Sequence, residues 1–145
     1  MAIRQMEPPQ AYEMLSTSDA IYLDVRTEAE FARGYPAGAI NIPVIFIHGP
    51  GQMAPNNDFL AVAESVLSKD QVLVVGCMAG GRSQRACEIL EAAGYQNLIN
   101  VRGGFGGARD ASGQLVVPGW LDANLPVSSE LGENTYQSLR AKAGL

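Results

Sequence analysis

The feature that most constrains the fold is the short apolar run QVLVVG at residues 71–76, which leads through a glycine-rich turn into an amphipathic segment. A run with so few polar residues is typical of a strand that is buried on both faces of a sheet. Over residues 82–93 the apolar side chains recur at helical spacing, and Gly94 follows as a stop signal. A strand followed by a helix in this way predicts a parallel sheet with helices packed against it.

The remainder of the chain repeats this alternation of strand and helix. Strands are expected at residues 2–6, 20–25, 38–43 and 97–101. Helices are expected to open at Pro8 and Pro9, and over residues 27–34 and 58–69. Residues 46–57 contain Gly and Pro at turn-forming density, which predicts a loop. We therefore expect an α/β fold with a mainly parallel five-stranded sheet and helices on both faces.

Length and composition favour a globular protein with a single domain. The 145 residues can bury a core of their own, 47% of them are hydrophobic, and no apolar run approaches the ~20 residues that a membrane span requires. The first residues lack the basic and apolar regions of a secretory signal, so we expect a soluble cytoplasmic protein, as a monomer or homodimer. A net charge of −5 without a clustered basic face argues against nucleic acid as a partner.

The sequence contains two cysteines, Cys77 and Cys87, which are too few for a disulfide framework and lack the spacing of a zinc site. A metal site is therefore not expected, and the sequence implies no organic cofactor. Cys87 falls beside the apolar stripe of the predicted helix, which favours a core cysteine. The alternative is a resolving role, in which Cys87 attacks an oxidised or sulfur-loaded Cys77.

Cys77 begins the glycine-rich turn after the buried strand. Backbone N–H groups in such a turn, together with the positive end of a helix, attract anions. Arg82 adds a positive charge, and the small residues Ala79, Gly80 and Gly81 leave room for a ligand. We therefore expect Cys77 to be a thiolate at the floor of an anion-binding cup. The alternative is a buried, inert cysteine at the end of a strand.

The carboxyl ends of the predicted parallel strands meet at one edge of the sheet, where ligands bind in folds of this kind. Asp24 and Arg26, the turn from Cys77 and the glycine-rich segment from Arg102 are all expected at this edge. The sequence leaves open whether Asp24 and Arg26 orient the turn, contact a substrate, or form only a local ion pair or turn cap.

The segment Cys77-Met78-Ala79-Gly80-Gly81-Arg82-Ser83 fits the pattern Cys-x-x-Gly-x-Arg-Ser and resembles the active-site loop of single-domain rhodaneses, which are thiosulfate sulfurtransferases. YLDVRTEAEFARGYPAGAINIP resembles the family's N-terminal signature, and NVRGGFGG followed by GWLDANLPV resembles its C-terminal one. The likeness covers residues 5–127, so a rhodanese domain is expected over residues 1–128. Residues 129–145 are expected to form a tail, either a short helix or a frayed end.

The resemblance implies sulfur transfer in two steps. Cys77 takes the outer sulfur of thiosulfate or another small sulfur-containing anion as a persulfide, and cyanide, a thiol or a protein then accepts it. It implies catalytic roles for Cys77 and Arg82, a supporting role for Asp24 and Arg26, and substrate binding by the rest of the loop: Met78, Ala79, Gly80, Gly81 and Ser83. A persulfide carrier for one protein partner would need the same cup, and the sequence does not separate these two alternatives.

Related folds include tyrosine phosphatases and arsenate reductases, whose loop between cysteine and arginine is one residue longer. Only four residues separate Cys77 from Arg82, which favours a smaller cup suited to one sulfur atom. The chain departs from the rhodanese pattern at Tyr35, where many members have histidine, and at Asn124, where glycine is usual. Residues 105–119 are longer than the corresponding segment of the smallest members, and we expect them to fold over the cup and shape acceptor access.

Overall fold

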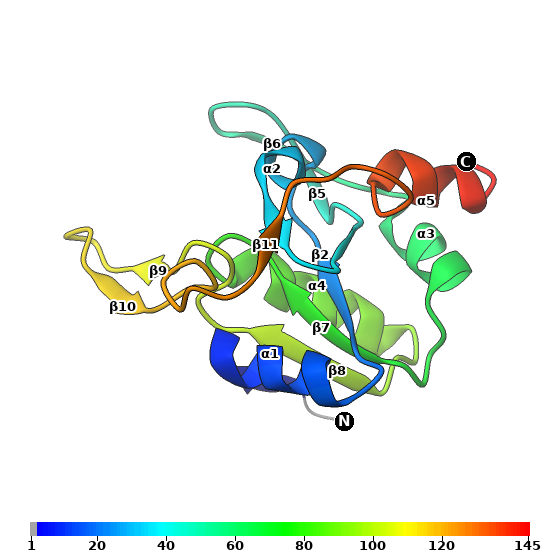
Figure 1. The fold of residues 1–145 in the computed structure, drawn as a ribbon. Coiled ribbons are helices and arrows are strands. Elements are labelled where there is room, and N and C mark those ends of the chain that lie inside the picture. The colour runs from blue at the N-terminus through cyan, green and yellow to red at the C-terminus, as the bar shows by residue number, and fades with distance from the viewer. Residues whose placement is uncertain (1–2) are drawn as a thin grey trace.

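The computed structural model describes residues 3–145 and is built around one five-stranded sheet (Figure 1). Its strand order is β1-β8-β7-β2-β4, and every neighbouring pair is parallel. The strands are β1 (Arg4–Met6), β2 (Ile21–Asp24), β4 (Ile40–Asn41), β7 (Val72–Gly76) and β8 (Asn97–Val101). The predicted α/β fold with a parallel five-stranded sheet is confirmed. Position 2 of the expected first strand lies outside the described residues.

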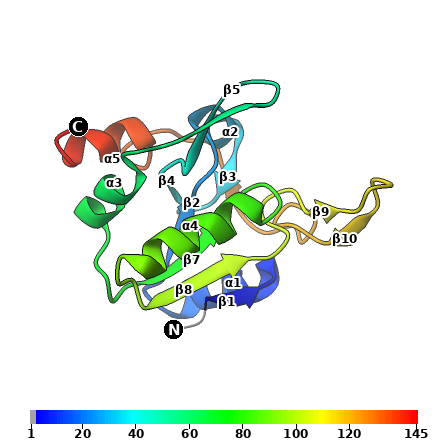
Figure 2. The ribbon, with the colours of Figure 1, turned by 180° about the vertical axis from the view of Figure 1, so that it is seen from behind.

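Helices cover both faces of this sheet. α1 (Pro8–Thr17) lies in front of the sheet in Figure 1, and α4 (Gly81–Ala92) lies in front of it in the reverse view of Figure 2. α3 (Phe59–Val66) packs into the same apolar cluster as α4, and α2 (Glu28–Arg33) contributes Phe31 to the cluster of α1. Successive strand residues point to opposite faces, so Leu73 of β7 joins the α4 cluster and Val74 joins the α1 cluster.

Residues 46–57 form a hairpin rather than the predicted loop. β5 (Ile45–Gly49) pairs in antiparallel fashion with β6 (Gln52–Pro55), and the chain turns at Pro50 and Gly51. The prediction of a loop is wrong because the β-forming run of residues 45–47 precedes the turn, so that the glycine and proline residues mark the turn alone.

Residues 105–119 contain a second hairpin. β9 (Ala108–Arg109) and β10 (Leu115–Val117) are antiparallel and project away from the sheet (Figure 1, yellow). Asp110 closes the turn by accepting hydrogen bonds from the N–H groups of Ser112 and Gln114. The hairpin tip projects away from the sheet (Figure 1) and is stabilised by its own hydrogen bonds. The prediction that residues 105–119 fold over the cup is therefore wrong for this tip.

The C-terminal segment, from residue 127 on, packs against the rest of the chain. β11 (Val127–Ser128) pairs with β3 (Tyr35–Pro36). α5 (Tyr136–Lys142) lies beside α3 and buries Tyr136 and Leu139 in the α4 cluster, whereas Leu131 is exposed. None of the helices among residues 3–145 combines the length and apolar character needed to span a bilayer.

Candidate active site

Cys77 lies directly after β7, at the edge of the sheet where the parallel strands end. Its Sγ accepts a hydrogen bond from the N–H group of Gly80 at 3.0 Å and lies 3.4 Å from Oγ of Ser83. Gly80 has a φ of 117°, in the left-handed region, and this conformation brings its N–H back toward the sulfur. Cys77 is 2% exposed, so the sulfur sits below the protein surface.

The loop around Cys77 offers backbone donors to an anion. Among residues 3–145, the N–H groups of Met78 and Ala79 have no acceptor. Gly81 and Arg82 occupy the first turn of α4, where N–H groups lack a helical partner. These groups lie at the positive end of the α4 dipole, an arrangement that favours negative charge. The anion-binding cup and its use in substrate binding remain predictions, with which these free donors are consistent.

The outer side of the loop is held by the chain that follows β8. Phe105 and Gly106 donate backbone hydrogen bonds to the carbonyl oxygens of Cys77 and Met78, at 2.8 and 2.9 Å. Gly104 makes this approach possible, because its φ is +55° and a Cβ at this position would collide with the carbonyl oxygen of Cys77. The base of the segment 105–119 thus contacts the cup even though its tip does not.

Arg82 does not bond to the sulfur. Its two terminal nitrogens donate to the two carboxylate oxygens of Glu30, at 2.7 and 3.0 Å. Glu30 also closes the capping box at the start of α2, where it accepts from the N–H of Thr27 and Thr27 accepts from the N–H of Glu30. The role of Glu30 cannot be predicted from the sequence: Thr27 and Glu30 carry a helix-start signal, but nothing local connects that signal to Arg82.

This ion pair controls the ionisation of both partners. Burial works against the charged carboxylate of Glu30, but the hydrogen bonds from Arg82 and Thr27 outweigh it and lower the pKa of Glu30 from 4.5 to about 2. The hydrogen bond to Glu30 in turn raises the pKa of Arg82. Both partners are therefore ionised, and a charge-compensated ion pair lies beside the first turn of α4.

Asp24 and Arg26 form a buried ion pair one strand away from Cys77. Nε and Nη2 of Arg26 donate to the Asp24 carboxylate at 3.0 and 2.7 Å, and Nη2 also donates to the carbonyl oxygen of Gly34. Burial raises the pKa of Asp24 although Arg26 opposes the shift. The guanidinium lies 4.4 Å from the ring centre of Phe105, whose N–H is bonded to Cys77. The pair thus reaches the loop through Phe105.

Cys87 is fully buried in the α4 cluster, which confirms its interpretation as a core cysteine. Burial raises the pKa of its thiol to about 12, so the thiolate needed for a resolving role is disfavoured. Both cysteines are free. Within residues 3–145, no cluster of three or more His, Cys, Asp or Glu side chains is placed to hold a metal ion.

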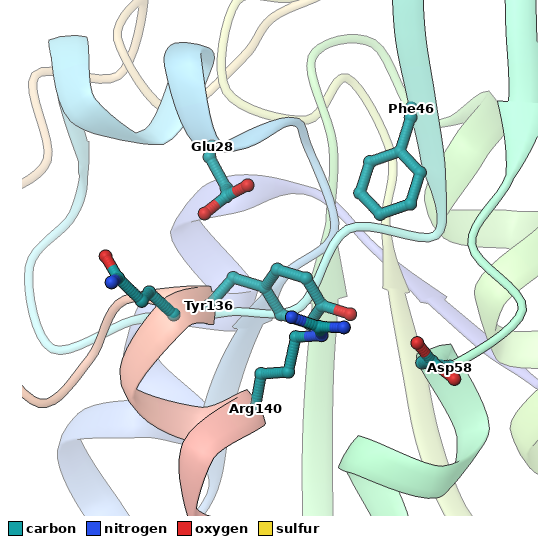
Figure 3. A pocket seen from close by; sticks show the side chains of 6 residues that line it. Glu28, Phe46, Asp58, Tyr136 and Arg140 are labelled. Carbon is teal, nitrogen blue, oxygen red and sulfur yellow. The ribbon is translucent and has the colours of Figure 1, made fainter. Parts of the chain in front are cut away.

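Pockets lie both at the loop and away from it. A pocket of about 460 Å³ borders Ala79 and Gly80 of the loop, Asn100 and Arg102 at the end of β8, and the base of the β9–β10 hairpin. A pocket of about 420 Å³ is shown in Figure 3, where Tyr136 lies between Glu28 and Arg140. The residues of the second pocket do not belong to the Cys77 loop, so it is not part of the candidate active site.

Fold and site together define an α/β protein in which a cysteine follows a central strand and is enclosed by the donors of a helix-initiating loop. A family model described as a rhodanese-like domain matches residues 7–111. The chain belongs to the rhodanese family, and the resemblance seen in the sequence is confirmed.

Relatives and solved structures agree with this assignment. Protein HIGH ARSENIC CONTENT 1, mitochondrial, from Arabidopsis thaliana is 46% identical over 90 residues, which cover 62% of this chain and 53% of that protein. Thiosulfate sulfurtransferase 18 from the same plant is 36% identical over 111 residues, 75% of this chain and 72% of that protein. The crystal structure of Rv0390 from M. tuberculosis matches with a TM-score of 0.74 and 30% identity, and covers 90% of this chain and all of that one. The chain thus spans about half the length of the first relative.

Proposed function

We propose that this chain transfers a sulfane sulfur from thiosulfate or a similar donor to a thiophilic acceptor, through a persulfide on Cys77. The observation that carries the proposal is the position of Cys77 Sγ, 3.0 Å from the N–H of Gly80 in a loop of unpaired backbone donors at the start of α4. Similarity to a relative named thiosulfate sulfurtransferase 18 supports the same chemistry.

The first half-reaction loads the cysteine. The Cys77 thiolate attacks the outer sulfur of thiosulfate, a new sulfur–sulfur bond forms, and sulfite leaves with the electron pair of the broken bond. Negative charge then resides on the outer sulfur of the persulfide. The N–H groups of the loop would stabilise that charge as an oxyanion hole stabilises oxygen.

The second half-reaction regenerates the thiolate. A nucleophile such as cyanide or a thiolate attacks the outer sulfur, and the electron pair of the persulfide bond returns to Cys77. Splitting the transfer into two covalent steps predicts ping-pong kinetics. The acceptor would approach from the pocket that borders Ala79 and Gly80, where Arg102 offers a positive charge.

Arg82, Asp24 and Arg26 act on the loop rather than on the sulfur in this proposal. Arg82 pairs with Glu30 and thereby holds α2 against the first turn of α4. The pair of Asp24 and Arg26 supports Phe105 and thereby the carbonyl of Cys77. The expected cytoplasmic location remains a prediction, because two Arabidopsis relatives are named as mitochondrial and chloroplastic.

An arsenic oxyanion is the second candidate substrate. The observation in its favour is the 46% identity to the protein named HIGH ARSENIC CONTENT 1. Against it stands the short loop, since four residues between Cys77 and Arg82 leave a cup suited to a single sulfur atom. Sulfur transfer is therefore the better-supported function.

Steady-state kinetics test the proposal. Thiocyanate formation from thiosulfate and cyanide should give parallel double-reciprocal lines as the second substrate is varied, and Cys77→Ser should abolish it. Intersecting lines, or turnover that survives Cys77→Ser, would reject a Cys77 persulfide. Arsenate reduction with a thiol reductant, measured with the same two proteins, would instead favour the second candidate.

A further inference from the structure

Ser83 lies between the candidate nucleophile and a buried amide. Its Oγ is 3.4 Å from Sγ of Cys77, 3.2 Å from the carbonyl oxygen of Gly80 and 2.5 Å from Oδ1 of Asn100. Ser83 and Asn100 are both buried. A hydroxyl group has one proton to donate, so only one of the three acceptors can receive it fully. The shortest contact is the one with Asn100.

The orientation of the Asn100 amide follows from its neighbours. Its Nδ2 donates to Oε1 of Gln5 at 2.9 Å and lies 3.4 Å from the carbonyl oxygen of Gly80. The Gln5 amide is itself oriented by donating from Nε2 to Gln84 at 2.7 Å. Asn100 is 4% exposed and lies opposite Gln5 of β1, so the hydrogen bond from Nδ2 to Gln5 fixes how the amide is turned. Oδ1 is therefore presented to Ser83 as an acceptor.

We propose that Asn100 is a positioning residue that holds the hydroxyl proton of Ser83 away from Cys77. With that proton bonded to Asn100, Ser83 offers Sγ of Cys77 a lone pair instead of a donor. Compared with a hydroxyl that donates to Sγ, this arrangement favours the states in which Sγ itself carries no negative charge. These are the thiol, whose S–H can donate to Ser83, and the persulfide, whose charge lies on the outer sulfur.

The consequence for sulfur transfer rests on the proposed function. During loading, the electron pair of the thiolate forms the new sulfur–sulfur bond, and sulfite departs with the pair of the bond that breaks. Charge moves from Sγ to the outer sulfur without any proton transfer, and Ser83 keeps its bond to Asn100 throughout. Asn100 thereby shifts the balance from the free thiolate of Cys77 toward its sulfur-loaded form.

Alkylation of Cys77 by iodoacetamide tests this assignment without any sulfur donor. The thiolate is the reacting species, so the rate at one fixed, mildly acidic pH reports how well the thiolate is stabilised. Asn100→Leu removes the acceptor and leaves the Ser83 proton to Sγ and the carbonyl oxygen of Gly80, of which a charged sulfur is the stronger acceptor. A new hydrogen bond from Ser83 should stabilise the Cys77 thiolate and so increase the fraction of protein that carries it. A stabilised thiolate is a weaker nucleophile, which offsets part of this gain, so we expect the alkylation rate to rise about threefold.

A double-variant cycle separates this effect from simple loosening of the structure. The rise caused by Asn100→Leu should disappear in a Ser83→Ala background. Asn97→Leu, a matched change in the same strand, should leave the rate as in the wild type. A rise that persists without Ser83 would overturn the assignment. A Ser83→Ala protein that alkylates about threefold more slowly than the wild type would also overturn it, because Ser83 would then already donate to Sγ.

Asn100→Ala removes the same acceptor and replaces Asn100→Leu if that variant does not fold, as judged by its melting curve. The outcome is separable from that of the proposed function. If Asn100→Leu raises the alkylation rate only when Ser83 is present, but the wild-type protein takes up no sulfur, sulfur transfer is rejected and the role of Asn100 stands. If the protein takes up sulfur but its alkylation rate does not change with Asn100→Leu, the proposed function stands and the role of Asn100 is rejected.

Discussion

Glu30 binds both terminal nitrogens of Arg82 across a sequence separation of 52 residues. The pair joins the first turn of α2 to the first turn of α4, immediately after the Cys77 loop. Arg82 and Glu30 are only 20% and 17% exposed, so solvent screens their attraction less than it screens an ordinary surface pair. The end of the loop is thus fixed by a helix that follows a different strand of the sheet.

Removing the carboxylate of Glu30 should weaken both stability and activity. We expect Glu30→Gln to lower the free energy of unfolding by about 1–3 kcal/mol, because a half-buried guanidinium loses its charged partner. The kcat/KM for thiosulfate should fall about tenfold as the loop loses support. Glu28→Gln, on the exposed side of the same turn, is the control and should cost no more than about 0.5 kcal/mol in thermal unfolding. Equal losses in the two variants would contradict a special role for the pair.

The same pair should make stability depend on pH. The pKa of Glu30 is lowered from 4.5 to about 2 in the folded protein. A carboxyl group with a lowered pKa adds stability above its unfolded pKa, and that contribution is lost as the pH falls through this interval. The stability gap between wild type and Glu30→Gln should therefore shrink between pH 4.5 and about 2, as measured by urea unfolding. Asp24, whose pKa is raised, contributes with the opposite sign in both proteins. A gap that stays constant would rule out the explanation.

Gly104 should tolerate no side chain. Its φ is +55° and a Cβ would strike the carbonyl oxygen of Cys77, so Gly104→Ala must displace the loop. We expect a loss of more than about 3 kcal/mol and of thiosulfate turnover. Gly113→Ala is the matched control: its φ is +86° but a Cβ there meets nothing within 4 Å. That variant should lose about 1 kcal/mol and keep its turnover. Similar behaviour of the two would mean that backbone strain, and not the contact with Cys77, sets the requirement for glycine.

Cys87 should matter for stability and not for sulfur transfer. It is fully buried, and Cys87→Ala leaves a small cavity that we expect to cost about 1–2 kcal/mol. Thiosulfate:cyanide turnover at a temperature where the variant is folded should stay within about twofold of the wild type. A folded Cys87→Ala protein without turnover would restore the resolving role.

The elements that could be predicted from the sequence are those whose structure is determined by residues close to one another in the chain. β7, its turn and α4 follow from an apolar run, glycines and helical spacing within one continuous segment. The partners of the site come from elsewhere: Glu30 reaches Arg82 over 52 residues and Asn100 reaches Ser83 over 17. No periodicity encodes such contacts, because they depend on how the strands are ordered in the sheet. The β5–β6 hairpin escapes prediction for a different reason, since the glycine and proline residues of its turn outnumber the short β-forming run beside them.

Intact-mass spectrometry after incubation with thiosulfate tests the central claim most directly. The wild-type protein should gain the mass of one sulfur atom, lose it again on addition of cyanide, and release sulfite during loading. Cys77→Ser should gain nothing, whereas Cys87→Ala should gain one sulfur like the wild type. No gain by the wild type, or an equal gain by Cys77→Ser, would contradict sulfur transfer from thiosulfate through Cys77.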